Sequence, residues 1–260
     1  MLAILRNRFR YLLLTVVAVG LVSVSCKNKN EQPKADLAHT EDVWAQADAI
    51  IKEIGTVTFQ DSVFNINEYG AVADGATLNT EAFKAAIAAC NQAGGGKVLI
   101  PEGTYLTGPI HLKSNVNLHL EADAEVLFTT DKIAYLPAVH TSYEGMEIMN
   151  YSPLIYAKGQ KNIAVTGRGT FNGQANSENW WPWCGAERYG HKEGEPQQKD
   201  EHNLPTLFTM IEDGTPVEER IFGEGHQLRP LFLQTLECEN VLIQGVTFTN
   251  APFWVIHPLK

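Results

Sequence analysis

The stretches NVNLHL (residues 115–120), NIAVTG (162–167) and NVLIQG (240–245) share one pattern, in which an Asn is followed by alternating aliphatic residues. Such alternation beside a turn residue is typical of short β-strands. A strand unit that recurs with its own bend residue favours a solenoid, whose coils bury their aliphatic side chains against one another. We therefore expect stacked parallel strands, with each bend Asn bonded to the Asn of the next coil. An antiparallel sandwich is the alternative that this pattern leaves open.

Two helical patterns precede these three strands. The first begins with Thr40 as the expected N-cap and stops at Gly55, and the second begins at Asn79 or Thr80 and ends at Gly94–Gly96. Their apolar stripes consist of Val43, Trp44, Ala47, Ile50, Ile51 and Ile54 in the first, and of Phe83, Ala86, Ile87 and Cys90 in the second. We expect both helices to cap the solenoid.

Residues 174–229 interrupt the strand pattern with a polar, acidic segment that contains WWPWCG at 180–185. An excursion of this length from a solenoid is usually a surface insertion on one face, often the face that binds a ligand. We therefore expect an insertion within a β-helix domain that extends over residues 40–260.

The first 25 residues have the features of an export signal. Three Arg residues precede an apolar run at 11–22, which is shorter than a membrane-spanning helix needs. Small residues and Cys26 follow, and this arrangement resembles the lipobox of bacterial lipoproteins, with Ser23 in place of the usual Leu. The resemblance implies cleavage before Cys26, lipidation of its thiol and an exported outer-membrane lipoprotein that faces the periplasm or the cell surface. Residues 26–39 are expected to form a flexible tether.

Composition narrows the classes of partner. The chain has 20 Lys and Arg against 30 Asp and Glu, a formal net charge of −10, so we expect no nucleic-acid partner. No His or Cys spacing resembles a metal site, and we expect neither a metal nor a cofactor. Cys90, Cys184 and Cys238 cannot all pair within one chain; free thiols are expected, and a Cys184–Cys238 disulfide stays open.

A family resemblance appears in three further stretches: FNINEYGAVADG (64–75), TEAFKAAIAACNQAGGGKVLIPEGTY (80–105) and RPLFLQTLECENVLIQGVTFTNAPFWVIHP (229–258). The first two are similar to the start of pectin-degrading β-helix enzymes. The third resembles glycoside hydrolase family 28, the polygalacturonases and rhamnogalacturonases. The resemblance implies a mainly β protein with a right-handed parallel β-helix of the pectin lyase type.

The chemistry that the resemblance implies is hydrolysis of glycosidic bonds in pectic polysaccharide with inversion. One carboxylic acid protonates the leaving oxygen, and a second carboxylate about 6.5–9.5 Å away activates water. In the family, these groups come from an Asn-Thr-Asp motif and an Asp-Asp pair, which are followed by His-Gly and Arg-x-Lys motifs. None of these motifs occurs in this sequence. We therefore assign no catalytic residue, and expect an inactive N-terminal fragment that is truncated at its C-terminal side.

Aromatic residues are the remaining candidates for contact with sugar, because a flat ring packs against the C–H face of a pyranose. The candidates are Trp180, Trp181 and Trp183 in the insertion, with Trp254 and His257 near the end of the chain. The expected partner is a pectic polysaccharide or oligosaccharide, with contact to a membrane only through the lipid anchor.

Two other functions stay open. A non-catalytic carbohydrate-binding β-helix lipoprotein would use the Trp-rich insertion alone. A lyase on the same fold would need calcium and an Arg base, and no motif in the sequence supports it. The last strands are expected to expose Val255 and Ile256, which favours aggregation of the isolated chain.

Overall fold

The computed structural model describes residues 37–260, with side-chain surroundings from residue 43 onward. The described chain separates into a helical unit that ends at Gly55 and a compact unit from Thr56 to Lys260. The expected signal peptide at 1–25 and lipidation site at Cys26 lie outside the described residues. No helix within the described part of the chain is both long and apolar enough to cross a bilayer.

Helix α1 spans Leu37–Ile54, so it begins inside the segment predicted as a tether and ahead of the predicted cap at Thr40. The compact fold begins at Thr56, not at residue 40 as predicted. The reason for the error is that amphipathic spacing shows that a helix has an apolar stripe without showing what covers it. The stripe of α1 is exposed at Val43, Trp44, Ile50, Ile51 and Ile54.

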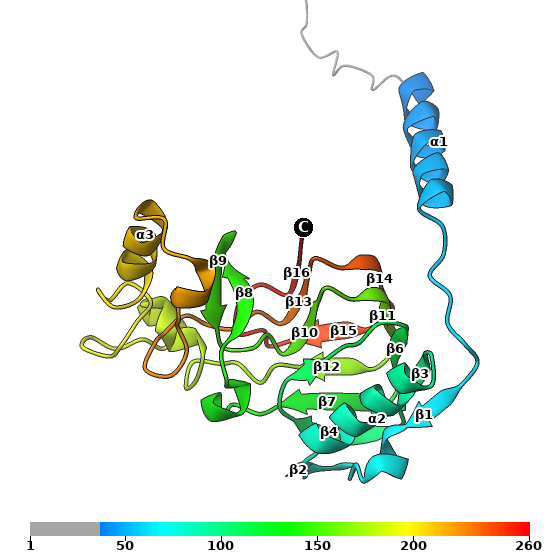
Figure 1. Ribbon diagram of the computed structural model, residues 1–260, viewed down its shortest axis with the longest axis horizontal. Coiled ribbons are helices and arrows are strands. Elements are labelled where there is room, and N and C mark those ends of the chain that lie inside the picture. Colours follow the sequence, from blue (N-terminus) through cyan, green and yellow to red (C-terminus); the bar gives the residue numbers. More distant parts are fainter. Residues whose placement is uncertain (1–36) are drawn as a thin grey trace, which may run out of the picture. The chain divides into compact units, whose positions relative to one another are not determined.

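The compact unit is a parallel β-helix, in which the chain passes repeatedly through three sheets (Figure 1). Sheet A contains β1 (Val63–Asn65), β3 (Gly96–Ile100), β6 (Val116–Leu120), β11 (Lys161–Gly167) and β14 (Glu239–Gln244). Sheet B contains β2 (Asp74–Leu78), β4 (Gly103–Thr107), β7 (Ala124–Phe128), β12 (Thr170–Asn172) and β15 (Thr247–Thr249). Sheet C contains β5 (Ile110–His111), β10 (Ile155–Lys158), β13 (Leu233–Leu236) and β16 (Ile256–Leu259). Neighbouring strands within each of these sheets are parallel, which confirms the predicted solenoid over the antiparallel alternative.

The three repeated Asn residues occupy the bends between sheets C and A. Asn115, Asn162 and Asn240 have φ angles of 63°, 52° and 55°, a left-handed conformation that Asn tolerates better than most residues. Their amides form a ladder along the solenoid. Asn162 Nδ2 donates to Asn115 Oδ1 at 3.2 Å, and Asn240 Nδ2 donates to Asn162 Oδ1 at 2.9 Å. This confirms the predicted contact between successive bends.

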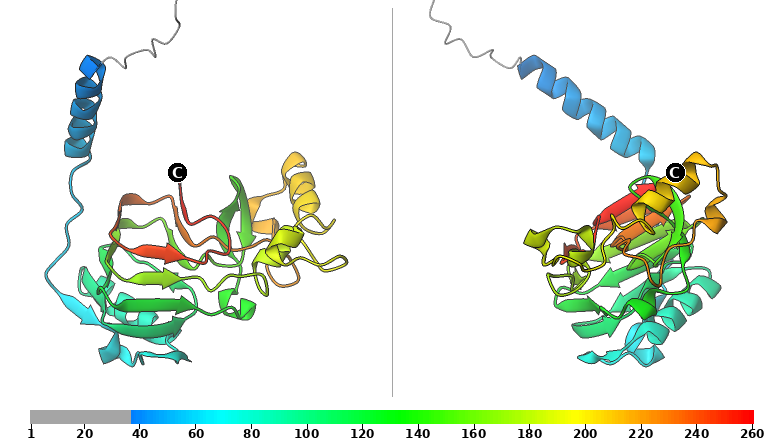
Figure 2. Two further views of the ribbon diagram at one scale, coloured as in Figure 1. Left: turned by 180° about the vertical axis from the view of Figure 1, so that it is seen from behind. Right: turned by 90° about the vertical axis from the view of Figure 1, so that its left-hand side faces the viewer.

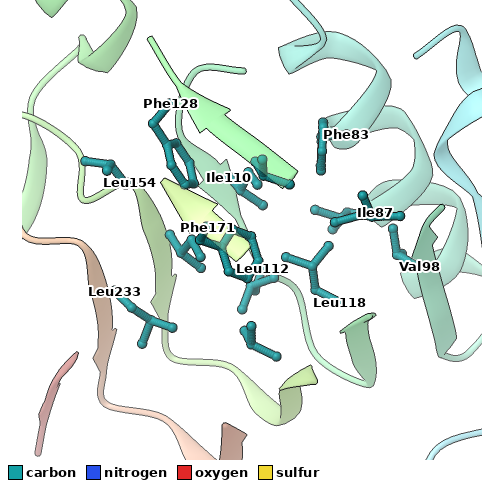
Figure 3. Close-up of a cluster of buried hydrophobic side chains, with 14 of the residues drawn as sticks. Phe83, Ile87, Val98, Ile110, Leu112, Leu118, Phe128, Leu154, Phe171 and Leu233 are labelled. Carbon is teal, nitrogen blue, oxygen red and sulfur yellow. The ribbon is translucent and has the colours of Figure 1, made fainter. Parts of the chain in front are cut away.

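Helix α2 (Thr80–Gln92) covers one end of the coils, as predicted. Its Phe83 and Ile87 are buried in the same cluster as Val98 of β3 and Leu118 of β6 (Figure 3). Further along the interior, Phe171 stacks on Phe248 with ring centroids 5.6 Å apart. Aliphatic and aromatic side chains therefore fill the centre of the solenoid from the helical end onward.

The Gly-rich ending of α2 has a steric cause. At Gly96, where φ is 145°, an added Cβ would lie 2.5 Å from the carbonyl oxygen of Ser62. Only glycine fits this approach of β3 to the preceding chain.

Asp74, which belongs to the stretch that resembles pectin-degrading enzymes, has a structural role. Its Oδ1 accepts the N–H groups of Ala76 and Thr77, and the hydrogen bonds from Thr77 contribute most to lowering the pKa of Asp74 to about 2.

Two excursions from the coils lie on the same side of the solenoid (Figure 2). The first contains η2 (Lys132–Tyr135) and an antiparallel hairpin of β8 (Val139–Tyr143) and β9 (Met146–Asn150). The second corresponds to the predicted insertion at 174–229 and joins β12 to β13. Its helices are η3 (Trp181–Cys184), η4 (Glu187–Tyr189), α3 (Leu204–Glu212) and η5 (Val217–Glu219). A further short helix, η1 (Ile66–Tyr69), lies outside the insertion, directly after β1. Hairpin and insertion share a small core formed by Tyr143, Ile148, Leu207, Phe222 and Leu228.

The cysteines of the described chain are free. Cys90 is buried, whereas Cys184 and Cys238 are half-buried, so the disulfide left open by the sequence is not formed. Burial raises the pKa of the Cys90 thiol to about 11. Val255 and Ile256 of the last described coil are 40% and 47% exposed, as expected.

Candidate functional site

The outer face of sheet C carries a column of polar side chains. Strand register aligns His111, Tyr156, Gln234 and His257 across its four strands. Their neighbours Ile110, Ile155 and Leu233 point the other way and are buried in the core, as the alternation of a β-strand requires.

The β8–β9 hairpin covers the middle of this column. The hydroxyl of Tyr156 donates to the carbonyl oxygen of His140, and the hydroxyl of Thr141 donates to Oε1 of Gln234. Tyr156 is 7% exposed and Gln234 is not exposed at all. A ligand therefore cannot reach the centre of the column while the hairpin is in place.

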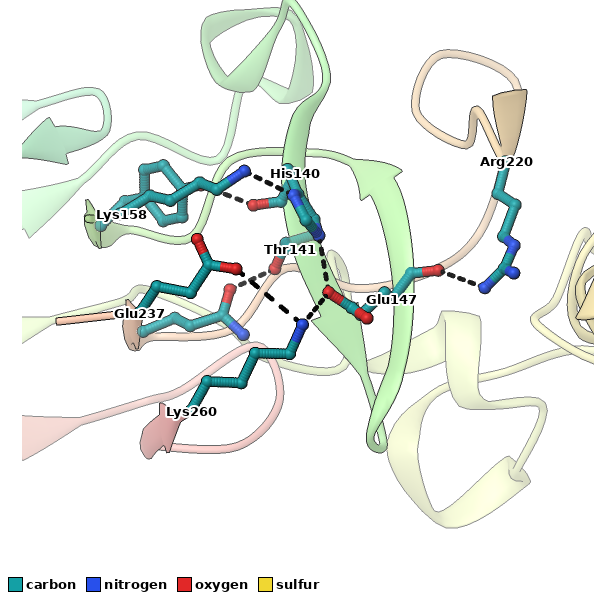
Figure 4. Close-up of polar contacts among 9 residues, drawn as sticks. His140, Thr141, Glu147, Lys158, Arg220, Glu237 and Lys260 are labelled. Atoms are coloured by element: carbon teal, nitrogen blue, oxygen red, sulfur yellow. Dashed lines mark hydrogen bonds and ion pairs between the residues drawn. The ribbon is translucent and has the colours of Figure 1, made fainter. Parts of the chain in front are cut away.

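Charged side chains fasten the hairpin to sheet C (Figure 4). Lys158 Nζ donates to His140 Nδ1 at 2.6 Å, and His140 Nε2 donates to Glu147 Oε1 at 3.0 Å. Lys260 Nζ donates to the same carboxylate oxygen at 2.6 Å and lies 3.9 Å from Glu237. The hydrogen bond from Lys260 is the main cause of the lowered pKa of Glu147.

His257 lies at the end of the column and is half-buried. Its Nδ1 accepts a hydrogen bond of 3.3 Å from Nε2 of Gln234, because an amide nitrogen only donates. Burial lowers the pKa of His257, which favours the neutral ring at neutral pH with the proton on Nε2. This predicted sugar-contact residue therefore presents an N–H donor on its other side.

An aromatic cavity of about 330 Å³ lies where the insertion meets the loop between β15 and β16. Trp181 and Trp254 both line it, so the structure brings together two of the residues predicted to contact sugar. Trp254 is 52% exposed, while Trp181 is half-buried and donates its indole N–H to the carbonyl oxygen of Ala251 at 2.8 Å. The full lining, called the aromatic cavity below, consists of Trp181, Cys184, Tyr189, Arg229, Ala251, Pro252, Phe253 and Trp254.

Tyr189 lines this cavity but was not among the residues predicted to contact sugar. Its ring meets Trp181 edge-on, with centroids 6.2 Å apart. Gly190, at φ 90°, ends the short η4 helix directly after it. That glycine was the available turn signal, but it could not show that the turn lies beside the tryptophans.

The prediction that Trp180 contacts sugar is wrong. Trp180 has no exposed surface and meets Tyr135 and Trp183 edge-on, with centroids 5.6 and 5.2 Å away. Trp183 packs against the same core but remains half-buried, and neither residue lines the aromatic cavity. Lys132 Nζ lies 5.4 and 5.3 Å from the two ring centroids. These two tryptophans anchor the insertion.

A larger cavity of about 800 Å³ lies against the outer face of sheet A. Its His119 bonds to Thr166 at 2.8 Å, and Thr166 donates to Asn117 at 2.7 Å, so its central polar groups are already paired. Its rim carries three carboxylates, from Glu102, Glu121 and Asp123, against the cations Lys97 and Arg168. The aromatic cavity has no acidic residue in its lining and is therefore the better place for an acidic sugar.

Comparisons with known proteins agree with this fold. The family described as rhamnogalacturonase A/epimerase, pectate lyase-like, matches residues 63–186. A probable polygalacturonase from Vitis vinifera is 27% identical over 74% of this chain and 33% of its own length. An exo-poly-alpha-D-galacturonosidase from Dickeya chrysanthemi is 34% identical over 45% of this chain and 20% of its own length. The chain thus spans a third or less of these relatives.

Solved structures extend the comparison to most of the compact unit. An exopolygalacturonase from Thermotoga maritima is 47% identical, with a TM-score of 0.77 over 82% of this chain and 48% of that protein. A family 28 exopolygalacturonase from Yersinia enterocolitica is 26% identical, with a TM-score of 0.53 over 76% of this chain and 37% of that protein. The chain therefore has the right-handed, pectate lyase-like parallel β-helix fold of the family 28 type, as the sequence resemblance predicted.

Proposed function

We propose that this chain is part of a glycoside hydrolase that acts on pectic polysaccharide, and that the aromatic cavity binds the sugar chain. The proposal rests above all on the pairing of Trp181 with Trp254 around one open cavity. The high identity to an exopolygalacturonase supports the same substrate class. Aromatic faces and a concave lining are what a pyranose needs, because its C–H face is apolar and its rim is polar.

The proposal gives the described residues a role in binding, without hydrolysis. An inverting mechanism needs two free carboxyl groups on opposite sides of the scissile bond. Glu147 and Glu237, which border the polar column of sheet C, are both engaged by Lys260. Glu147 is accounted for by holding the hairpin and Glu237 by its contact with Lys260, so no step of bond cleavage is assigned to them.

Binding is tested by calorimetry with trigalacturonate, using the full chain and its Trp181→Ala and Trp254→Ala variants. Each substitution is expected to weaken binding about tenfold, because it removes an aromatic wall of the cavity. Trp44→Ala is the matched control, since Trp44 lies on α1, outside the compact unit. Absence of binding by the unaltered chain at millimolar ligand would refute the proposal.

Hydrolysis is tested by measuring reducing ends released from polygalacturonate. The chain of 260 residues is expected to release none above a no-enzyme control. Release that persists after purification to homogeneity would contradict the proposed division between binding and catalysis. Binding without release is also the outcome expected of a purely carbohydrate-binding protein. That second candidate is kept because the lining of the aromatic cavity contains no carboxylate.

We also propose that the protein is exported and lipidated at Cys26. Support comes from the sequence pattern of residues 1–26 alone. Metabolic labelling with a radioactive fatty acid in a bacterial host is expected to label the unaltered protein but not Cys26→Ser. Equal labelling of the two proteins, or sedimentation of Cys26→Ser with membranes, would count against the anchor.

A further inference from the structure

Arg229 is the charged residue in the lining of the aromatic cavity, whose other members are aromatic, small or proline. Its guanidinium carbon lies 4.6 Å from the ring centroid of Phe253. Phe253 in turn stacks on Tyr143 of the hairpin, with centroids 4.8 Å apart and planes 16° from parallel. Arg229 therefore lies on a stack that joins the last loop to the β8–β9 hairpin.

Two hydrogen bonds fix the guanidinium in place. Nη1 donates to the carbonyl oxygen of Pro252 at 3.2 Å, and Nη2 donates to Oε1 of Gln198 at 3.3 Å. Both acceptors are neutral. The hydroxyl of Tyr143 also lies in hydrogen-bond contact with the guanidinium. A guanidinium has five N–H groups, so these neutral partners do not use all of them. The remaining nitrogen, Nε, is buried and has no acceptor among the described residues.

Arg229 also lacks a counter-charge. None of the carboxylates in the described chain lies within ion-pair distance of it, although the protein carries a formal net charge of −10. Half-buried cations are normally paired, because removing a charge from water without a partner costs free energy. An unpaired arginine in an acidic protein, held rigidly beside aromatic rings, has the features of a site for an external anion with an apolar face.

We propose that the aromatic cavity is a subsite for a single uronate residue, whose carboxylate is bound by Arg229 while its ring packs against the tryptophans. The inference deepens the proposed function and rests on it. A volume of about 330 Å³ is at the lower end of ligand cavities, which suits one sugar residue better than a longer segment. Charge-assisted bonds from a guanidinium would distinguish the uronate from a neutral hexose, which presents a hydroxymethyl group in the same place.

The test removes the charge from each partner in turn. Calorimetry compares trigalacturonate with its methyl ester, using the full chain, Arg229→Gln, Arg229→Lys and the control Arg168→Gln. Arg168 is exposed on the rim of the sheet A cavity, so its substitution removes the same charge elsewhere. The unaltered chain and Arg168→Gln are expected to bind the acid about 10- to 100-fold more tightly than the ester. Arg229→Gln is expected to bind both ligands alike, at the affinity of the ester, with Arg229→Lys intermediate.

The comparison of trigalacturonate with its methyl ester needs only the unaltered chain, so the test stays decisive if Arg229→Gln folds poorly. Equal affinity of that chain for acid and ester would overturn the subsite. So would a full preference for the acid in Arg229→Gln, or equal weakening of both ligands by this substitution. If Trp254→Ala still weakens binding in those cases, the proposed function stands and only the role of Arg229 falls. If the unaltered chain binds neither ligand, both proposals fail.

Discussion

Asn162 is the middle member of the bend ladder, because its side chain both donates to Asn115 and accepts from Asn240. Asn162→Ala removes both hydrogen bonds and places a Cβ without a polar group at φ 52°. We expect a loss of about 2–4 kcal/mol in the free energy of unfolding. Asn162→Gly keeps the left-handed backbone free of strain, so its smaller loss of about 1–2 kcal/mol isolates the ladder. Urea titration measures both, and equal stabilities of the two variants would contradict the strain component.

Trp180 gives a second prediction for a single residue. Trp180→Ala empties a fully buried site between Tyr135 and Trp183, and is expected to cost about 3–5 kcal/mol. Trp254→Ala is the control, because a side chain that is 52% exposed leaves little cavity behind and is expected to change thermal stability only slightly. Equal loss of stability in the two variants would show that Trp180 does not anchor the insertion.

These two residues show what the sequence could and could not reveal. The Asn bends were predictable because their spacing repeats with the strands, and stacking then places equal residues side by side. The orientation of the tryptophans was not predictable, since WWPW by itself does not show which face meets the core. Trp180 and Trp183 stand three residues apart, and the helical 3₁₀ turn that contains Pro182 directs such a pair to one side.

Among the elements of the fold, the β8–β9 hairpin has no clear signal in the sequence. Its turn is formed by Glu144 and Gly145, with φ angles of 51° and 89°. Hairpin turns of this kind usually carry Asn-Gly or Asp-Gly, because a long side chain at positive φ is disfavoured. The hairpin instead depends on tertiary contacts, through Tyr143 to Phe253 and through Glu147 to Lys260.

The ion pair of Glu147 makes the stability of the hairpin dependent on pH. The folded pKa of Glu147 lies below its ordinary value of 4.5, mainly because Lys260 donates to it. Its contribution is therefore complete above pH 4.5 and is lost as the pH falls through the lowered folded pKa. We expect Glu147→Gln to be about 0.5–1 kcal/mol less stable than the unaltered chain at pH 7, with the difference shrinking below pH 4.5.

Chemical denaturation across this pH range measures the effect. Glu144→Gln is the matched control, since Glu144 is exposed at the tip of the same hairpin and forms no ion pair within the described chain. The same stability difference at pH 3 and pH 7 for Glu147→Gln would contradict the assignment.

At the scale of the molecule, the strand order and the capping helix α2 followed from local pattern because a solenoid is built from contacts between neighbouring repeats. The start of the compact unit at Thr56 could not be predicted from the sequence, because the apolar stripe of α1 has the same spacing as that of a helix packed on a core. The aromatic cavity could not be predicted from the sequence either, because its lining combines residues of the insertion with residues of the β15–β16 loop. Such contacts depend on how two long excursions fold back on one face.

The charge of the whole molecule leads to a kinetic prediction for the proposed ligand. A protein with a net charge of −10 repels trigalacturonate at long range, whereas Arg229 attracts it only within the cavity. Salt screens the long-range term first, since the Debye length falls from about 30 Å at 0.01 M to about 8 Å at 0.15 M. Stopped-flow tryptophan fluorescence is therefore expected to show an association rate that rises with salt for trigalacturonate and is nearly constant for its uncharged methyl ester. Arg229→Gln should raise the dissociation rate more than it alters this salt dependence, because short-range contacts act mainly on dissociation. An association rate for trigalacturonate that falls with salt would mean that local attraction already dominates at a distance, and would contradict the separation of the two effects.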